Sequence, residues 1–185
     1  MESYFKRAVF DNFNKKVLPN KVLILLGARR VGKTELIKNY LKTVPAETYL
    51  QLNGEDINDA NLLQERSVVN YKRLLANIDL LVIDEAQTIP EIGLILKLIV
   101  DSIEGIKIIA TGSSVFDLNN TLGEPLVGRK NTMYLFPLAQ MEFSTQENYK
   151  QTTENLEERL LFGGYPELVH YEDWEEKKEY LYEII

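Results

Sequence analysis

The segment GARRVGKT, residues 27–34, constrains this chain more than any other feature of its sequence. It matches the pattern G-x-x-x-x-G-K-[ST], the Walker A phosphate loop. The apolar run Val22–Leu26 before it predicts a buried strand, and the pattern of Lys33–Leu41 after it predicts a helix. A glycine-rich loop between a strand and a helix presents backbone N–H groups to an anion. The sequence therefore predicts a nucleotide phosphate site here.

The residue types in this loop assign individual roles. We expect Lys33 to reach the β- and γ-phosphates and the Thr34 hydroxyl to bind Mg²⁺. Side chains inside such loops often point away from the nucleotide, so we favour a structural role for those of Arg29 and Arg30. The residues expected to surround the nucleotide are Gly27, Ala28, Arg29, Arg30, Val31, Gly32, Lys33, Thr34 and Glu35.

A pair of acids follows a second apolar run, Leu80–Ile83. Asp84 is the expected Walker B acid, which holds Mg²⁺ directly or through water. Glu85 is the expected general base that polarises the attacking water. Gln87 is close enough in sequence to position water, but we favour a structural role. Two adjacent acids at a strand end are a weak signal alone, but together with the phosphate loop they indicate a functional site.

Hydroxyl side chains follow a third apolar run that ends at Ala110. The carboxyl ends of parallel strands face the ligand crevice, so a hydroxyl here can contact the γ-phosphate or the attacking water. Ser113 and Ser114 are the first candidates for this sensor role, with Thr111 behind them. The alternative is that these hydroxyls cap the next helix.

Apolar runs alternate with helical patterns along the chain, which predicts an α/β fold with a mainly parallel sheet between helices. After residue 138 the pattern is helical, interrupted near Gly163–Pro166. We expect a P-loop core at residues 1–137 and a small helical appendage at 138–185. The predicted strands are Val22–Leu26, Thr48–Leu52, Asp79–Ile83, Ile106–Ala110 and Thr132–Phe136. The predicted helices are Phe5–Leu18, Lys33–Leu41, Leu62–Ala76 and Glu91–Ile103, with a short helix or turn at 115–118.

Composition excludes several other classes of protein. The chain has no Cys and a single His, His170, which rules out a disulfide scaffold, a thiolate zinc site and a multi-histidine metal site. The net charge of −7 disfavours a nucleic-acid motor without excluding it. We find no signal peptide and no apolar run long enough to span a bilayer, so we expect a cytoplasmic protein without a membrane partner.

The motif series resembles the AAA-like ATPases of bacteria and archaea that carry a second domain of unknown function. The matching segments are GARRVGKT, LLVIDEAQTIP, IIATGSS, LVGR and FGGYPELV. The resemblance implies the additional-strand, catalytic-glutamate branch of P-loop folds, and adenine as the base. It also implies that the second domain continues beyond this chain, and that Arg129 is an arginine finger in cis or in trans. A structural ion pair is the alternative for Arg129.

These observations predict Mg²⁺-dependent ATP hydrolysis that drives a conformational change in an attached domain or a protein partner. The proposed catalytic residues are Glu85, Lys33, Ser113 and Arg129. The main alternative is an ATP-binding switch with little turnover, and a small-molecule kinase is a weaker one, because residues 119–130 contain one Arg for a lid. The sequence does not predict the biological substrate, the partner or the oligomeric state.

Overall fold

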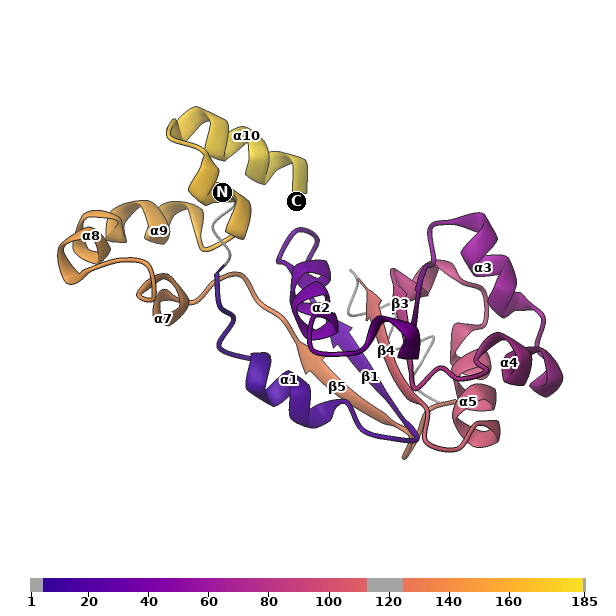
Figure 1. Cartoon of the computed structure of the whole chain (residues 1–185). Coiled ribbons are helices and arrows are strands. Elements are labelled where there is room, and N and C mark those ends of the chain that lie inside the picture. Colours follow the sequence, from indigo (N-terminus) through magenta and orange to yellow (C-terminus); the bar gives the residue numbers. More distant parts are fainter. Residues whose placement is uncertain (1–4, 113–124, 185) are drawn as a thin grey trace.

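The computed structural model of the 185-residue chain describes residues 5–112 and 125–184. Its centre is one five-stranded sheet in the order β2-β3-β4-β1-β5 (Figure 1). Every pair of neighbouring strands is parallel, which confirms the predicted α/β fold. The strands are β1 (Lys21–Leu26), β2 (Tyr49–Asn53), β3 (Leu80–Asp84), β4 (Lys107–Gly112) and β5 (Lys130–Tyr134).

The strand order separates the strand before the phosphate loop from the strand before the acid pair. β4 lies between β1 and β3, with Ala110 paired to Ile24 on one side and to Ile83 on the other. This is the inserted-strand order that the resemblance implies. Because all five strands run the same way, the residues after β1, β3 and β4 meet at one edge of the sheet.

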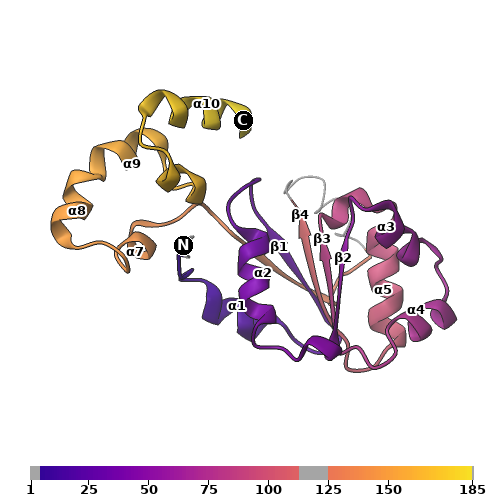
Figure 2. The same ribbon diagram turned by 45° about the horizontal axis from the view of Figure 1, so that its top comes forward.

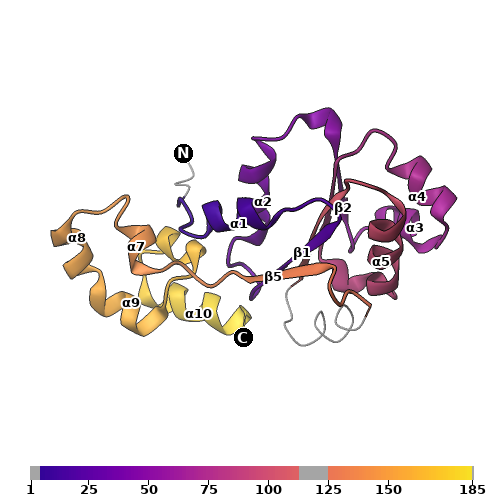
Figure 3. The same cartoon turned by 90° about the horizontal axis from the view of Figure 1, so that it is seen from below.

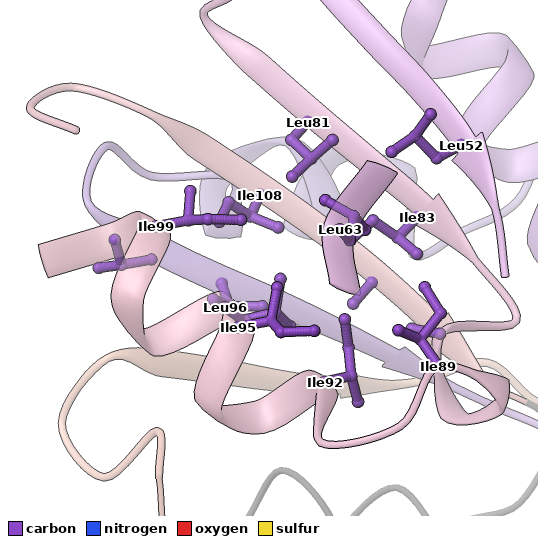
Figure 4. Close-up of a cluster of buried hydrophobic side chains, with 14 of the residues drawn as sticks. Leu52, Leu63, Leu81, Ile83, Ile89, Ile92, Ile95, Leu96, Ile99 and Ile108 are labelled. Atoms are coloured by element: carbon purple, nitrogen blue, oxygen red, sulfur yellow. The ribbon is translucent and has the colours of Figure 1, made fainter. Parts of the chain in front are cut away.

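Helices cover both faces of the sheet (Figure 2). On one face α1 (Phe10–Lys16) and α2 (Lys33–Leu41) pack on alternate strand residues such as Leu23 and Leu25. On the other face α3 (Ile57–Gln64), α4 (Val68–Leu74) and α5 (Ile92–Ser102) pack on the residues between them. Figure 4 shows this second core, which includes Leu52, Leu63, Leu81, Ile83, Ile92, Ile95, Leu96, Ile99 and Ile108. Successive side chains of a strand point to opposite faces of the sheet. A strand that is covered by helices on both faces therefore needs consecutive apolar residues.

Two predicted helices differ from the observed ones. The predicted helix Phe5–Leu18 is shorter and spans only Phe10–Lys16. The predicted helix Leu62–Ala76 is two helices, because Ser67 adopts an extended conformation and its hydroxyl accepts from Asn70 N at the start of α4. A serine at such a position begins a new helix rather than continuing the old one. The predicted helix or turn at 115–118 lies outside the described residues.

Residues 138–184 form a helical unit beside the sheet (Figure 3). The chain breaks after α9 at Gly163 and resumes as a 3₁₀ helix at Pro166, as the sequence predicted. Among residues 5–112 and 125–184, no helix has both the length and the apolar character needed to cross a bilayer. The helices of the unit are α7 (Gln140–Phe143), α8 (Tyr149–Glu154), α9 (Leu156–Phe162), η3 (Pro166–His170) and α10 (Trp174–Ile184).

Candidate functional site

The phosphate loop lies between the end of β1 at Leu26 and the start of α2 at Lys33. Two glycines in it cannot be replaced without strain. Gly32 has φ +94°, a left-handed conformation that side chains disfavour. At Gly27 an added Cβ would lie 2.4 Å from the backbone oxygen of Leu135. The loop is thus built by glycine at its first and sixth positions, as the motif requires.

Lys33 extends back over the loop. Its Nζ donates to Gly27 O and Ala28 O, each at 2.9 Å, and the residue is only 6% exposed. Burial lowers the pKa of Lys33, and the nearby charges of Glu85 and Asp84 oppose that shift. The ammonium group is therefore a poorly hydrated cation, which favours the binding of an incoming phosphate.

Two residues from different elements converge on Asp84 at the end of β3. Thr34 Oγ1 donates to Asp84 Oδ2 at 2.9 Å, and the buried Thr111 hydroxyl donates to Asp84 Oδ1. The same Thr111 hydroxyl accepts from Glu85 N at 3.1 Å. Thr111 thus holds both acids from the neighbouring strand β4. The sequence ranked Thr111 behind Ser113 and Ser114, both of which lie outside the described residues.

The oxygens of Thr34 and Asp84 fit a magnesium ion. Mg²⁺ favours hard oxygen ligands and is usually bound by one or two carboxylates together with substrate phosphates and water. Among the described residues, no group of three or more His, Asp and Glu side chains is placed to hold a metal by itself. Nucleotide phosphates and water would therefore have to complete the coordination at this site.

Glu85 is held in a fixed position at the tip of β3. Its backbone is left-handed, with φ +49°, and Gln87 Nε2 donates to Glu85 Oε2 at 2.6 Å. Gly54 packs against the same turn, and a Cβ there would lie 2.5 Å from Glu85 O. The sequence analysis did not single out Gly54, because close approach between strand ends leaves no local signal.

A hollow of about 450 Å³ opens beside the phosphate loop. It lies between the start of α2 and the helical unit, and both apolar and charged side chains face it. Glu35, expected at the nucleotide, lines this hollow, and so does His170, which the composition analysis did not place in a site. Its lining includes Phe5, Arg7, Glu35, Leu138, Pro166 and His170.

The structure does not bring Arg129 to this site. Arg129 precedes β5, and its backbone oxygen accepts from Val22 N at the amino end of β1, whereas the phosphate loop follows the carboxyl end. Its Nε lies 2.6 Å from Asp101 Oδ1, the structural ion pair considered as the alternative. Arg30 in the loop points to the helical unit, with its guanidinium 5.2 Å from the ring centroid of Tyr180.

The comparison with protein families decides the classification. The family model of the AAA domain matches residues 19–144, which span the phosphate loop, the acid pair and all five strands. The chain belongs to the AAA domain family. This AAA domain is also 27% identical over 183 residues to an uncharacterized protein of Methanocaldococcus jannaschii. That alignment covers 92% of the chain and 41% of the relative.

A solved structure confirms the fold. It is the crystal structure of a Signal Transduction ATPase with Numerous Domains (STAND) protein with a tetratricopeptide repeat sensor from Pyrococcus horikoshii. The TM-score is 0.61 at 18% identity, over 100% of this chain and 33% of that chain. The AAA domain thus has a P-loop ATPase fold, and it spans well under half the length of both matched proteins.

Proposed function

We propose that this AAA domain binds ATP with Mg²⁺ and hydrolyses it. The observation that carries the proposal is the convergence of side chains from α2 and β4 on Asp84 at the end of β3. Thr34 from the phosphate loop and Thr111 from β4 both donate to this carboxylate, with Glu85 as the next residue. A Walker A loop alone supports binding, whereas a held carboxylate next to the metal acid supports hydrolysis.

Each residue has a role that follows from its position. The backbone N–H groups of the loop bind the phosphate oxygens, and Lys33 turns from the carbonyls of Gly27 and Ala28 to the β- and γ-phosphates. Thr34 and Asp84 hold Mg²⁺, which neutralises charge on the phosphates when bound. Glu85 accepts a proton from a water molecule while the oxygen of that water attacks the γ-phosphorus. The bond between the γ-phosphorus and the bridging oxygen then breaks, and ADP leaves with that oxygen.

The hollow between α2 and the helical unit is the proposed place for the nucleoside. Its volume of about 450 Å³ lies within the usual range of ligand pockets. It adjoins Gly32 and Glu35, so a nucleotide with its phosphates on the loop can extend into it. Adenine is the proposed base because of the family resemblance and because the chain lacks the guanine-reading pattern N-K-x-D.

The helical unit is the proposed recipient of any conformational change. It lines the nucleoside hollow through Leu138 and Pro166, so binding there would alter its contacts with the core. We propose that it begins a second part of the molecule at residue 138 and transmits the nucleotide state to an attached domain or a protein partner.

One observation favours a slower, switch-like variant of this function. Gln87 Nε2 holds the Glu85 carboxylate at 2.6 Å, which occupies one lone pair of the proposed base. In that state the amide of Gln87 competes with water for this oxygen of Glu85. A partner that released Gln87 would then raise the turnover.

The test compares nucleotide binding with phosphate release for the wild type, Lys33→Ala and Glu85→Gln. We expect Lys33→Ala to lose binding, and Glu85→Gln to bind ATP with turnover lowered by about 100-fold or more. Glu47→Gln, just before β2 at the opposite end of the sheet, is the control. Tight binding without phosphate release by the wild type would favour the switch. Absence of nucleotide binding would refute the proposal.

A further inference from the structure

Arg7 is a buried cation that joins three separate parts of the molecule. It is 6% exposed, although it lies in the segment before α1. Its Nε donates to Glu142 Oε1 at 3.1 Å, one Nη donates to Val31 O at 2.7 Å, and the other donates to Phe136 O at 2.6 Å. One guanidinium thus links the phosphate loop, the connection after β5 and helix α7.

The contact with Val31 falls at the most constrained part of the phosphate loop. Val31 lies between two left-handed residues, Arg30 with φ +60° and Gly32 with φ +94°. Its side chain is fully buried in the core under α1 and α2. A left-handed conformation at a residue other than glycine is unfavourable and needs support from its surroundings. Arg7 supplies such support at the carbonyl between the two.

The direction of the Val31 carbonyl fixes the direction of an amide that faces the anion. In a planar trans peptide the C=O of Val31 and the N–H of Gly32 point opposite ways. By holding the oxygen of Val31, Arg7 keeps the N–H of Gly32 turned to the other side of the loop. Backbone N–H groups in this loop are the expected ligands of the phosphates.

Glu142 holds the other side of Arg7 from within the helical unit. This residue is 4% exposed. Its Oε1 also accepts from Ala8 N at 2.7 Å, and its Oε2 accepts from Ala139 N at 2.9 Å. Arg7 is therefore locked in place by α7. The ring of Tyr180 in α10, stacked on Arg30, is a second contact between the helical unit and the loop.

We propose that Arg7 is a positioning residue through which the helical unit holds the phosphate loop in its anion-binding shape. The proposal rests on the proposed nucleotide site and adds that nucleotide affinity depends on the docked helical unit. The coupling runs from Glu142 to Arg7 to Val31 O. By linkage it is reciprocal, so a nucleotide on the loop strengthens the docking of α7.

The first test is ADP affinity of Arg7→Lys, measured by calorimetry well below its melting temperature. Lysine keeps the charge, but its compact ammonium lacks the planar fork whose three nitrogens reach Glu142, Val31 and Phe136, so we expect ADP to bind about tenfold more weakly. Arg66→Lys is the matched control, because Arg66 forms an ion pair with Glu91 away from the loop. Glu142→Gln should weaken binding similarly, and the double variant should lose less than the sum of the two.

The outcomes separate the two proposals. If the wild type does not bind ADP, the proposed function itself fails. If the wild type binds and folded Arg7→Lys binds equally well, only the positioning role of Arg7 is overturned. Additive losses in the double variant would also overturn it, because Arg7 would then act without Glu142.

Hydrogen exchange on the wild type keeps the proposal testable if Arg7→Lys does not fold. We expect ADP to slow exchange at the amides of Ala8 and Ala139, which both donate to Glu142. Unchanged exchange at both amides, with ADP bound and the loop amides protected, would refute the coupling.

Discussion

Thr34 Oγ1 and Asp84 Oδ2 are 2.9 Å apart and joined by a hydrogen bond, although β4 separates the strands that precede them. The two oxygens come from the start of α2 and the end of β3. Their distance is short enough for both to contact one ion. Thr34 and Asp84 thus have the spacing that two ligands of one ion require.

Replacement of Asp84 by Asn should uncouple nucleotide binding from magnesium. The amide keeps the size of the side chain but removes the charge that favours Mg²⁺. We expect ADP to bind in the absence of metal much as in the wild type. The additional affinity gained with Mg²⁺ should fall by about 10- to 100-fold, since charged contacts of this kind contribute about 1.5–3 kcal/mol. Calorimetry with and without Mg²⁺ measures both quantities. An unchanged Mg²⁺ response would place the metal elsewhere.

The Thr111 hydroxyl should be required for the geometry of both acids. Thr111→Val keeps the shape of the side chain and removes the donor to Asp84 and the acceptor for Glu85 N. We expect a loss of about 1–3 kcal/mol in the free energy of unfolding, because both partners lose a hydrogen bond in a buried region. Phosphate release should also fall.

Thr111→Ser is the matched control, because it keeps the hydroxyl. Its phosphate release should stay near the wild-type rate, with a smaller loss of stability on denaturant unfolding. Phosphate release by Thr111→Val as fast as that of Thr111→Ser would show that the hydroxyl is not required.

Gly54→Ala should damage the site through a steric contact. The new methyl would lie 2.5 Å from both Glu85 O and Thr88 Oγ1, so the turn that carries Glu85 must move. We expect a destabilisation of about 1–3 kcal/mol and a larger relative loss in phosphate release than in ADP affinity. Gly105→Ala is the control, because Gly105 has φ +82° and nothing within 4 Å. It should cost about 1 kcal/mol, without a specific effect on turnover. If Gly54→Ala and Gly105→Ala changed stability and phosphate release alike, the proposed steric effect on the turn that carries Glu85 would be wrong.

The sequence predicted those parts of the fold that depend on local pattern. The three central strands β1, β3 and β4 are largely apolar runs with both faces covered, so their positions were predicted within a few residues. The acid pair and the loop were found because their chemistry needs adjacent residues at a strand end. Ser67 shows the limit, since a polar residue inside an apolar helical pattern can either continue a helix or begin a new one.

The rest of the site depends on contacts between residues distant in sequence. Arg7 and Glu142 form a buried ion pair across 135 positions, and neither carries a local signal that names the other. The family resemblance implied an arginine finger at Arg129, in cis or in trans, with a structural ion pair as the alternative. Because β5 runs parallel to β1, the residue that precedes β5 lies at the amino ends of the strands, away from the phosphate loop of the same chain.

Nucleotide affinity should fall as the pH rises. The fall should begin at a lower pH than it would for a lysine with an ordinary pKa. Burial lowers the pKa of Lys33, and only its protonated form attracts the phosphates. As the pH rises through this lowered pKa, free Lys33 loses its proton, and ADP affinity should drop by up to about tenfold per pH unit. The stability of the nucleotide-free protein should change in the opposite direction. Since the folded pKa is below the unfolded one, the unfolded state holds more protons between them, and stability rises with pH in that window.

Calorimetric titrations from about pH 7 to pH 10 test this dependence. The tyrosines near α2 should not interfere, because burial raises the pKa of both Tyr40 and Tyr180. Lys33→Arg is the decisive variant, because its guanidinium stays protonated throughout, so its weaker binding should not vary with pH. The same fall of affinity in the wild type and in Lys33→Arg would assign the dependence to another group and show that Lys33 remains charged over this range.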